Sequence, residues 1–181
     1  MFKFDVKLTE QDYQKFNFFN SQESKFGKKL ILIWRVSFLV ILLIAIAFFI
    51  DRNGVDITTL ISLIPLIIIG VVFVVFTKPF LRFSTKKGIK MLEKKGKKLY
   101  SPVYTAEFFD DYLVETTTEI ESKVKYTALD SAYIVRNEDI YIYINIQQAV
   151  ILPRASFESQ EQWDSFLEFI ESKIDKVYVI E

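Results

Sequence analysis

The chain has 181 residues, its 23 lysines and arginines balance 23 aspartates and glutamates, and it contains no cysteine and no histidine. The missing cysteines exclude a disulfide framework, thiolate metal ligation and a cysteine nucleophile, and the missing histidines remove the commonest metal ligand and general base. We therefore expect a protein that is not an enzyme, and we assign no catalytic, cofactor-binding or metal-binding residue.

Residues 1–28 are expected to form a strand followed by a helix. Apolar and charged residues alternate over residues 2–8, a period-two pattern typical of a half-buried strand. Thr9 with Asp12 three positions later is a helix-capping pair, and an apolar stripe follows it. Because both apolar faces need a partner, we expect this segment to pack with the C-terminal domain. The stripe consists of Tyr13, Phe16 and Phe19.

Two apolar runs dominate the next part of the chain. Residues 30–50 contain one charge, Arg35, and residues 57–76 contain none. About 20 helical residues cross a hydrocarbon core of about 30 Å, so each run is long enough for a transmembrane helix. The connection at 51–56 is too short for a domain, so residues 29–77 are predicted to be an antiparallel transmembrane hairpin. Arg35 either extends to the lipid headgroups or has a functional role inside the membrane.

A basic connector, residues 78–100, follows the second run. Lysines also precede the first run, whereas the loop at 51–56 has one arginine, so the positive-inside rule places both ends in the cytoplasm. Topology alone explains most of these charges, and functional contact with anionic lipid is the alternative. Nucleic-acid binding is not expected, because no aromatic platform is interleaved with the basic residues. The candidate lipid contacts are Lys78, Arg82, Lys86, Lys87, Lys90, Lys94 and Lys95.

Residues 101–181 change to a β-rich pattern that ends in a helix. Short runs of β-branched and aromatic residues are separated by turns, which predicts an antiparallel meander. Ser159 and Gln162 form a capping pair at the start of a predicted helix over 159–174. The predicted fold is a membrane α-helical hairpin joined to an α+β cytoplasmic domain. The predicted strands are 103–109, 112–116, 122–127, 132–136, 140–145 and 149–152.

Isoleucines at every second position from 140 to 146 alternate with Tyr141, Tyr143 and Asn145. The isoleucines at 140, 142, 144 and 146 are expected to face the core, because alternate side chains of a strand point to opposite faces. The tyrosines at 141 and 143 then face another element or the solvent. Packing against the N-terminal strand and helix is the expected arrangement, and a ligand-binding surface is the alternative.

Three polar groups of this domain have both an ordinary and a functional interpretation. Asp110 and Asp111 are expected to form a turn, because adjacent carboxylates point apart and do not make an acid–base pair. The glutamates at 115, 119 and 121 are expected to be a solvated face, with weak binding of a hard cation as the alternative. Arg154 follows a strand end and can pair with a carboxylate or with an anionic headgroup.

The order of these features resembles the YcxB-like family of bacterial membrane proteins. The resemblance is carried by Leu8–Tyr13, the two apolar runs, the lysine-rich connector, FFDDYLVETTTEIESKVKYTALDSAYIV at 108–135, IYIYI at 140–144, AVILPRASF at 149–157 and QWDSFLEFI at 162–170. It implies a bacterial inner-membrane protein with a pleckstrin-homology-like sheet and terminal helix. It implies no established activity and no functional residues.

The leading hypothesis for function is a membrane-anchored cytoplasmic interaction or regulatory module without catalytic activity. Its partners would be the lipid bilayer and a membrane or cytoplasmic protein, and a second copy of the chain is a further partner. The alternative is a small oligomeric transport or permeability component, although two nearly uncharged spans lack the ionisable residues of an ion path, Arg35 excepted. No cofactor is implied.

Overall fold

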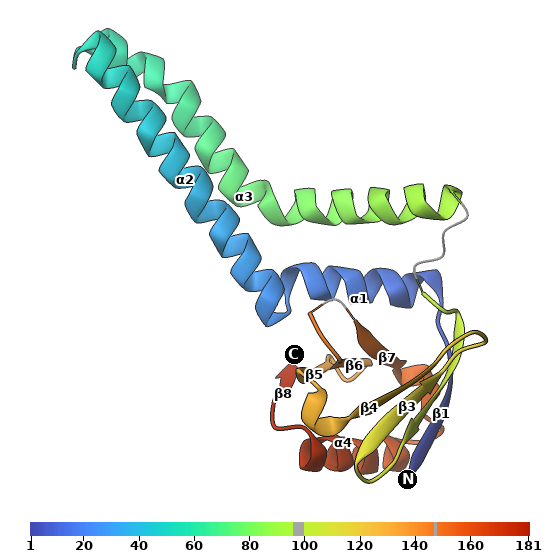
Figure 1. Ribbon diagram of the computed structural model, residues 1–181. Helices are drawn as coiled ribbons and strands as arrows, with labels where there is room; N and C mark the ends of the chain where they lie inside the picture. Colours follow the sequence, from blue (N-terminus) through green and yellow to red (C-terminus); the bar gives the residue numbers. More distant parts are fainter. Residues whose placement is uncertain (96–99, 147) are drawn as a thin grey trace. The chain divides into compact units, whose positions relative to one another are not determined.

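The chain folds into two compact units, seen in the computed structural model of Figure 1. The structure describes residues 1–95, 100–146 and 148–181. Residues 1–16 and 95–181 form a β-rich unit, and residues 17–94 form a helical unit. Helix α1 (Glu10–Gln22) therefore begins in the β-rich unit and ends in the helical unit.

The first sheet of the β-rich unit includes the N-terminal strand. Its strands are β1 (Phe2–Lys7), β2 (Val103–Phe108), β3 (Tyr112–Thr116) and β4 (Glu121–Lys125). They are antiparallel and lie in the order β1-β2-β3-β4, and β1 pairs with β2 along its whole length. The predicted alternation holds in β1, where Phe4 and Val6 are buried and the intervening charged residues are exposed. Segments far apart in the sequence are thus joined by backbone hydrogen bonds (Figure 1).

The second sheet has the order β7-β6-β5-β8. Its strands are β5 (Ser131–Val135), β6 (Asp139–Tyr143), β7 (Ala149–Pro153) and β8 (Val177–Ile180). The predicted antiparallel pairing is confirmed for β5, β6 and β7. The prediction of one continuous meander is wrong, however. A 3₁₀ turn at Tyr126–Ala128 ends the first sheet, and β8, which was not predicted, pairs in parallel with β5.

The inner faces of the two sheets meet through Tyr104 of β2. This side chain is buried, and its phenol donates a hydrogen bond to the carbonyl of Ile151 in β7 and accepts one from the Ile151 N–H at 3.1 Å. Burial raises the pKa of the Tyr104 phenol, so the group is uncharged. Both polar functions of the buried hydroxyl are satisfied, as a core requires.

Helix α4 (Gln160–Lys173) closes the core and follows the predicted range closely. Its cap is the predicted one, because the Oγ of Ser159 accepts the Gln162 N–H at 3.1 Å. The ring of Phe166 lies 4.9 Å from that of Phe4 in β1, in an edge-to-face arrangement. The buried residues of the helix are Trp163, Phe166 and Ile170.

Helix α1 covers the other face of the second sheet. The ring of Phe16 lies 5.2 Å from that of Tyr141 and 5.9 Å from that of Tyr143, and both tyrosines are buried. The packing interpretation of these tyrosines is therefore confirmed. The core position expected for Ile146 is wrong, because β6 ends at Tyr143 and Ile146 is exposed in the segment that follows, where Ile144 is half-buried.

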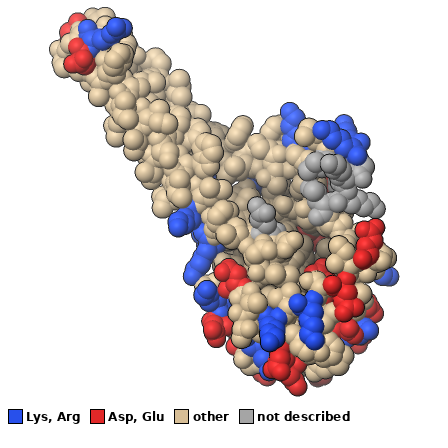
Figure 2. Space-filling model, in the orientation of Figure 1, with Lys and Arg blue, Asp and Glu red and all other residues tan. Residues whose placement is uncertain are grey.

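The helical unit contains two long antiparallel helices, α2 (Lys25–Asn53) and α3 (Ile57–Lys94). Gly54 adopts a φ of 78° at the reversal, a conformation that favours glycine. The rings of Phe38 and Phe73 stack with their centroids 3.9 Å apart. Both helices are long and apolar enough to cross a membrane. In Figure 2 the part of the hairpin between its charged tip and the basic residues at the other end is almost free of charge.

Helix α3 extends well beyond the predicted end of the second span at residue 76. It continues to Lys94, so most of the predicted basic connector is helical, and residues 96–99 of that connector lie outside the described part of the chain. Lysine, leucine and methionine favour helix, which explains the extension. Pro79 lies inside α3 and leaves the Val75 carbonyl without its usual N–H donor, and α3 bends between its apolar and basic halves in Figure 1.

Candidate functional site

The basic half of α3 presents the cationic residues that the sequence nominated. A lysine or arginine occurs at every fourth position from 78 to 94, which places these side chains in a row that winds slowly around the helix. Lys87 lies in the same half, and Lys95 directly follows the helix. All seven candidates are exposed, namely Lys78, Arg82, Lys86, Lys87, Lys90, Lys94 and Lys95.

Exposed phenylalanines, which the sequence-based prediction missed, are interleaved with these cations. Phe80 and Phe83 are 68% and 66% exposed, and Met91 is 53% exposed. Phe80, Phe83, Lys87 and Met91 are spaced by three or four residues, so they share one side of the helix. The expectation that no aromatic residues are interleaved with the basic residues was therefore wrong, although both phenylalanines are visible in the sequence. A helix with phenylalanine beside lysine suits a membrane–water boundary better than a single-stranded nucleic acid, which needs bases to stack along a groove.

A buried glutamine at the end of α1 is bonded to this half of α3. Gln22 is 1% exposed, its Nε2 donates to the Lys78 carbonyl at 3.4 Å, and its Oε1 accepts from the Nε of Arg82 at 3.1 Å. Both ends of the amide are thus used, which fixes its orientation. No periodic signal in the sequence singles out Gln22, because its importance depends on a contact between distant residues.

The joint between α1 and α2 holds Gln22 in place. The amides of Glu23 and Ser24 both donate to the Phe19 carbonyl, and Ser24 caps α2 by accepting the Gly27 N–H at 3.0 Å. Gly27 lies so close to the end of α1 that a Cβ there would be 2.5 Å from the Asn20 oxygen. The chain can therefore turn this tightly only with glycine at position 27.

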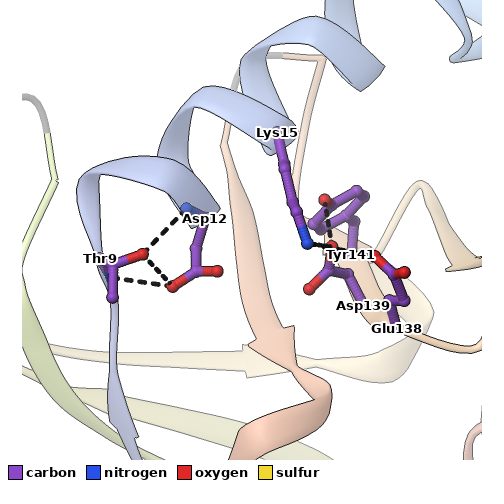
Figure 3. A network of polar contacts seen from close by, with 6 residues as sticks. All are labelled: Thr9, Asp12, Lys15, Glu138, Asp139 and Tyr141. Carbon is purple, nitrogen blue, oxygen red and sulfur yellow. Dashed lines mark hydrogen bonds and ion pairs between the residues drawn. The ribbon is translucent and has the colours of Figure 1, made fainter.

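A second polar cluster, drawn in Figure 3, connects α1 to the second sheet. The Nζ of Lys15 lies 3.1 Å from the Glu138 carboxylate and 4.0 Å from that of Asp139, and the phenol of Tyr141 donates to Asp139 at 3.1 Å. Burial raises the pKa of Asp139, while Lys15 and Tyr141 oppose that rise. The hydrogen bond to Glu138 raises the pKa of Lys15. This cluster positions α1, whose own start is capped by the predicted pair Thr9 and Asp12.

Arg35 lies in α2, four residues after Ile31 and within the apolar stretch. Its Nε is buried and has no hydrogen-bond partner among the described residues. Such a group inside an apolar helix either reaches the headgroups through its other nitrogens or marks a functional position. The transport alternative depends on this residue.

The comparisons with known proteins identify part of the β-rich unit. Residues 108–170, from the end of β2 to Ile170 in α4, match the family described as YcxB-like protein. In this segment the chain is similar to the YcxB-like family. The resemblance stated from the sequence is thereby confirmed for the segment. No curated protein matches the chain, and no solved structure matches it either.

The YcxB-like segment contains the acidic candidates, and the structure separates them. Asp110 and Asp111 form the predicted turn between β2 and β3, where the Phe109 amide donates to the Tyr112 carbonyl. Glu119 and Glu121 are exposed, whereas Glu115 is half-buried on β3. No group of three acidic side chains able to hold a metal occurs among the described residues. The cation alternative for the glutamates therefore gains no support.

Replacing Glu115 with glutamine should stabilise the β-rich unit at neutral pH. Burial raises the pKa of the Glu115 carboxyl above its value in the unfolded chain, so ionisation disfavours folding. Below the unfolded-state pKa, about 4.3, Glu115 is protonated in both the folded and the unfolded state, so it does not reduce the free energy of unfolding. The reduction develops as the pH rises through the folded-state pKa. Thermal melting at several pH values measures this, and the exposed Glu119→Gln is the control. An equal gain at acidic and neutral pH would contradict it.

Arg154 of the YcxB-like segment forms no ion pair with a carboxylate among the described residues. It follows β7, donates from Nη2 to the Gln160 side chain at 2.8 Å, and its guanidinium carbon lies 4.8 Å from the Trp163 ring. An amide and an indole therefore take the place of the expected carboxylate, an arrangement that suits the planar guanidinium. Arg154 thus helps to fix the start of α4.

Proposed function

We propose that the chain is an integral membrane protein whose hairpin anchors the β-rich unit, which acts as an interaction or regulatory module without catalytic activity. The observation that carries this proposal is the exposed apolar surface of α2 and α3. Soluble proteins rarely expose apolar patches larger than a few hundred Å², and larger ones mark contact with a membrane or a partner. Side chains that are more than half exposed include Leu32, Ile41, Leu43, Ile61, Ile68, Ile69 and Val71.

The dimensions of the helices support a bilayer rather than a protein groove as the partner of this surface. The apolar part of each helix has about 20 residues, which at about 1.5 Å per residue spans a hydrocarbon core of about 30 Å. The apolar residues also surround each helix and do not form one stripe, as expected for lipid on several sides. The charges at the hairpin tip would lie in the opposite headgroup layer.

The distribution of basic residues supports a cytoplasmic location for the base of the hairpin. Lys25, Lys28 and Lys29 precede the apolar part of α2, and the seven basic candidates follow that of α3. The tip has only Arg52, beside Asp51 and Asp56. By the positive-inside rule the β-rich unit then faces the cytoplasm. The membrane in this proposal is the inner membrane of a bacterial cell, which the resemblance to the YcxB-like family supports.

The β-rich unit supplies the surface for a partner in this proposal. We infer a pleckstrin-homology-like arrangement, because the antiparallel strands β2 to β4 and β5 to β7 belong to two sheets that meet at Tyr104, and because α4 follows them. Such a unit, held beside the membrane by the hairpin, would meet a membrane or cytoplasmic protein. The fold class carries no activity by itself, so the partner has to be found by crosslinking in native membranes.

Membrane insertion and topology can be tested with cysteine labelling, because the chain has no cysteine of its own. The protein should stay in the membrane pellet after washing with alkaline carbonate. An impermeant maleimide should label Asn53→Cys at the hairpin tip in intact spheroplasts, and Glu181→Cys only after the membrane is permeabilised. Release into the supernatant would refute membrane insertion. Labelling of Glu181→Cys in intact spheroplasts would refute the cytoplasmic location of the β-rich unit.

A further inference from the structure

We propose that Arg82, oriented by Gln22, binds the phosphate group of an anionic phospholipid at the base of the hairpin. This proposal rests on the proposed membrane insertion, and it goes beyond the general attraction of a basic segment to an anionic leaflet. It assigns one residue as a fixed phosphate ligand and another as its positioning residue. The flanking lysines contribute attraction without a defined geometry.

The orientation of Arg82 comes from a side chain that is itself immobilised. Gln22 is 1% exposed, and its amide nitrogen is bonded to the Lys78 carbonyl, so its oxygen can face only the Nε of Arg82. A buried amide with both ends bonded cannot rotate without losing hydrogen bonds in a dry environment. The guanidinium plane of Arg82 is therefore held at one edge, although Arg82 is an exposed residue.

The chemistry of the guanidinium then favours phosphate. The hydrogen bond to Gln22 uses Nε, so the fork made by Nη1 and Nη2 can bind a second partner. Two parallel N–H donors match two phosphate oxygens, a recognition mode that lysine cannot reproduce. Because less side-chain entropy is lost on binding when the group is already positioned, orientation by Gln22 increases affinity.

The surroundings of Arg82 match a lipid headgroup rather than a free anion. It lies six residues after Phe76, the last residue of the apolar part of α3, and the exposed Phe83 follows it directly. Lys78 and Lys86 lie one turn away on either side, which concentrates anionic lipid near the fork. A phosphate bound here would belong to a molecule whose acyl chains lie along the hairpin.

The test uses Trp34 as a built-in reporter of bound lipid. Trp34 of α2 is exposed. Phe38 stacks on Phe73, and the two helices are antiparallel, so Trp34, one turn before Phe38, lies close to the level of Lys78, which is just over one turn after Phe73. Full-length protein is reconstituted in mixtures of phosphatidylcholine and phosphatidylglycerol. In each mixture one of the two lipids carries brominated chains, which quench tryptophan fluorescence. The buried Trp163 contributes a constant background. The ratio of quenching by the two lipids gives the preference for the anionic headgroup.

Substitutions that keep the net charge separate a fixed ligand from general attraction. Arg82→Lys and Gln22→Met should each lower the preference for phosphatidylglycerol by about threefold or more, because they remove the fork or its orientation. The control Lys28→Arg, an exposed basic residue that precedes the apolar part of α2, should change it by less than about twofold. Arg82→Lys leaves Gln22 in place, so it remains informative if Gln22→Met disturbs the joint. Adding inorganic phosphate at constant ionic strength should leave the preference unchanged.

Each contrary result has a separate meaning. Unchanged preference in both Arg82→Lys and Gln22→Met would overturn the proposal while leaving membrane insertion intact. An equal loss in Lys28→Arg would also overturn it, since the effect would not be specific to Arg82. Competition by inorganic phosphate would assign the site to free anions instead of lipid. If neither brominated lipid quenched Trp34, membrane insertion itself would be refuted together with the lipid site.

Discussion

Replacing Phe4 with alanine is expected to lower the free energy of unfolding of the β-rich unit by about 3–5 kcal/mol, the usual cost of truncating a buried phenylalanine. Phe4 is 1% exposed, and its ring lies 4.7 Å from that of Phe157 and 4.9 Å from that of Phe166. The cavity would open between β1 and α4, where aromatic rings leave little freedom to collapse. A loss of this size would show that β1 is part of the core of the β-rich unit.

Lys3→Ala is the matched control for this substitution, because Lys3 is the neighbouring residue on the opposite face of β1. It forms a surface ion pair with Glu107 at 3.1 Å, and such pairs contribute about 0–1 kcal/mol. Denaturant titration can follow the fluorescence of the buried Trp163 in a Trp34→Phe background. A loss for Phe4→Ala no larger than that for Lys3→Ala would show that the β-rich unit is stable without β1.

Local sequence patterns predicted the elements that depend on near neighbours. The alternation at 2–8 gave β1, and the capping residues Thr9 and Ser159 gave the starts of α1 and α4. Burial on one face of an element leaves a periodic trace in the sequence, and a cap needs only residues three positions apart. The two apolar helices followed from length and composition alone.

Features that depend on contacts between distant residues leave no periodic pattern in the local sequence. Strand β8 has only four residues and pairs with the free edge of β5, so its periodicity is too short to predict a strand. β6 has buried residues on both faces because α1 covers it, and its alternation therefore does not separate a core face from a solvent face. The bond between Gln22 and Arg82 joins residues on different helices, which no local pattern reports.

Replacing Gly27 with alanine should disrupt the joint between α1 and α2, with a cost of about 1–3 kcal/mol typical of overpacking. An added Cβ would lie 2.5 Å from the Asn20 oxygen, 2.6 Å from the Ser21 carbonyl carbon and 2.8 Å from the Gln22 nitrogen. All three are backbone atoms, so relief requires the end of α1 to move. Such a movement would displace Gln22 from Arg82.

The sign of this effect is informative, because glycine-to-alanine changes inside helices usually stabilise by about 1 kcal/mol. Gly88→Ala in α3 provides that reference, since an added Cβ there meets nothing within 4 Å. Spin labels at Asn17→Cys and Lys28→Cys, in a chain without other cysteines, measure the distance across the joint. The distance distribution should shift or broaden with Gly27→Ala and stay unchanged with Gly88→Ala. If both variants kept the original distance and both were stabilised, the tight turn would not depend on glycine, and the fixed position of Gln22 would need another cause.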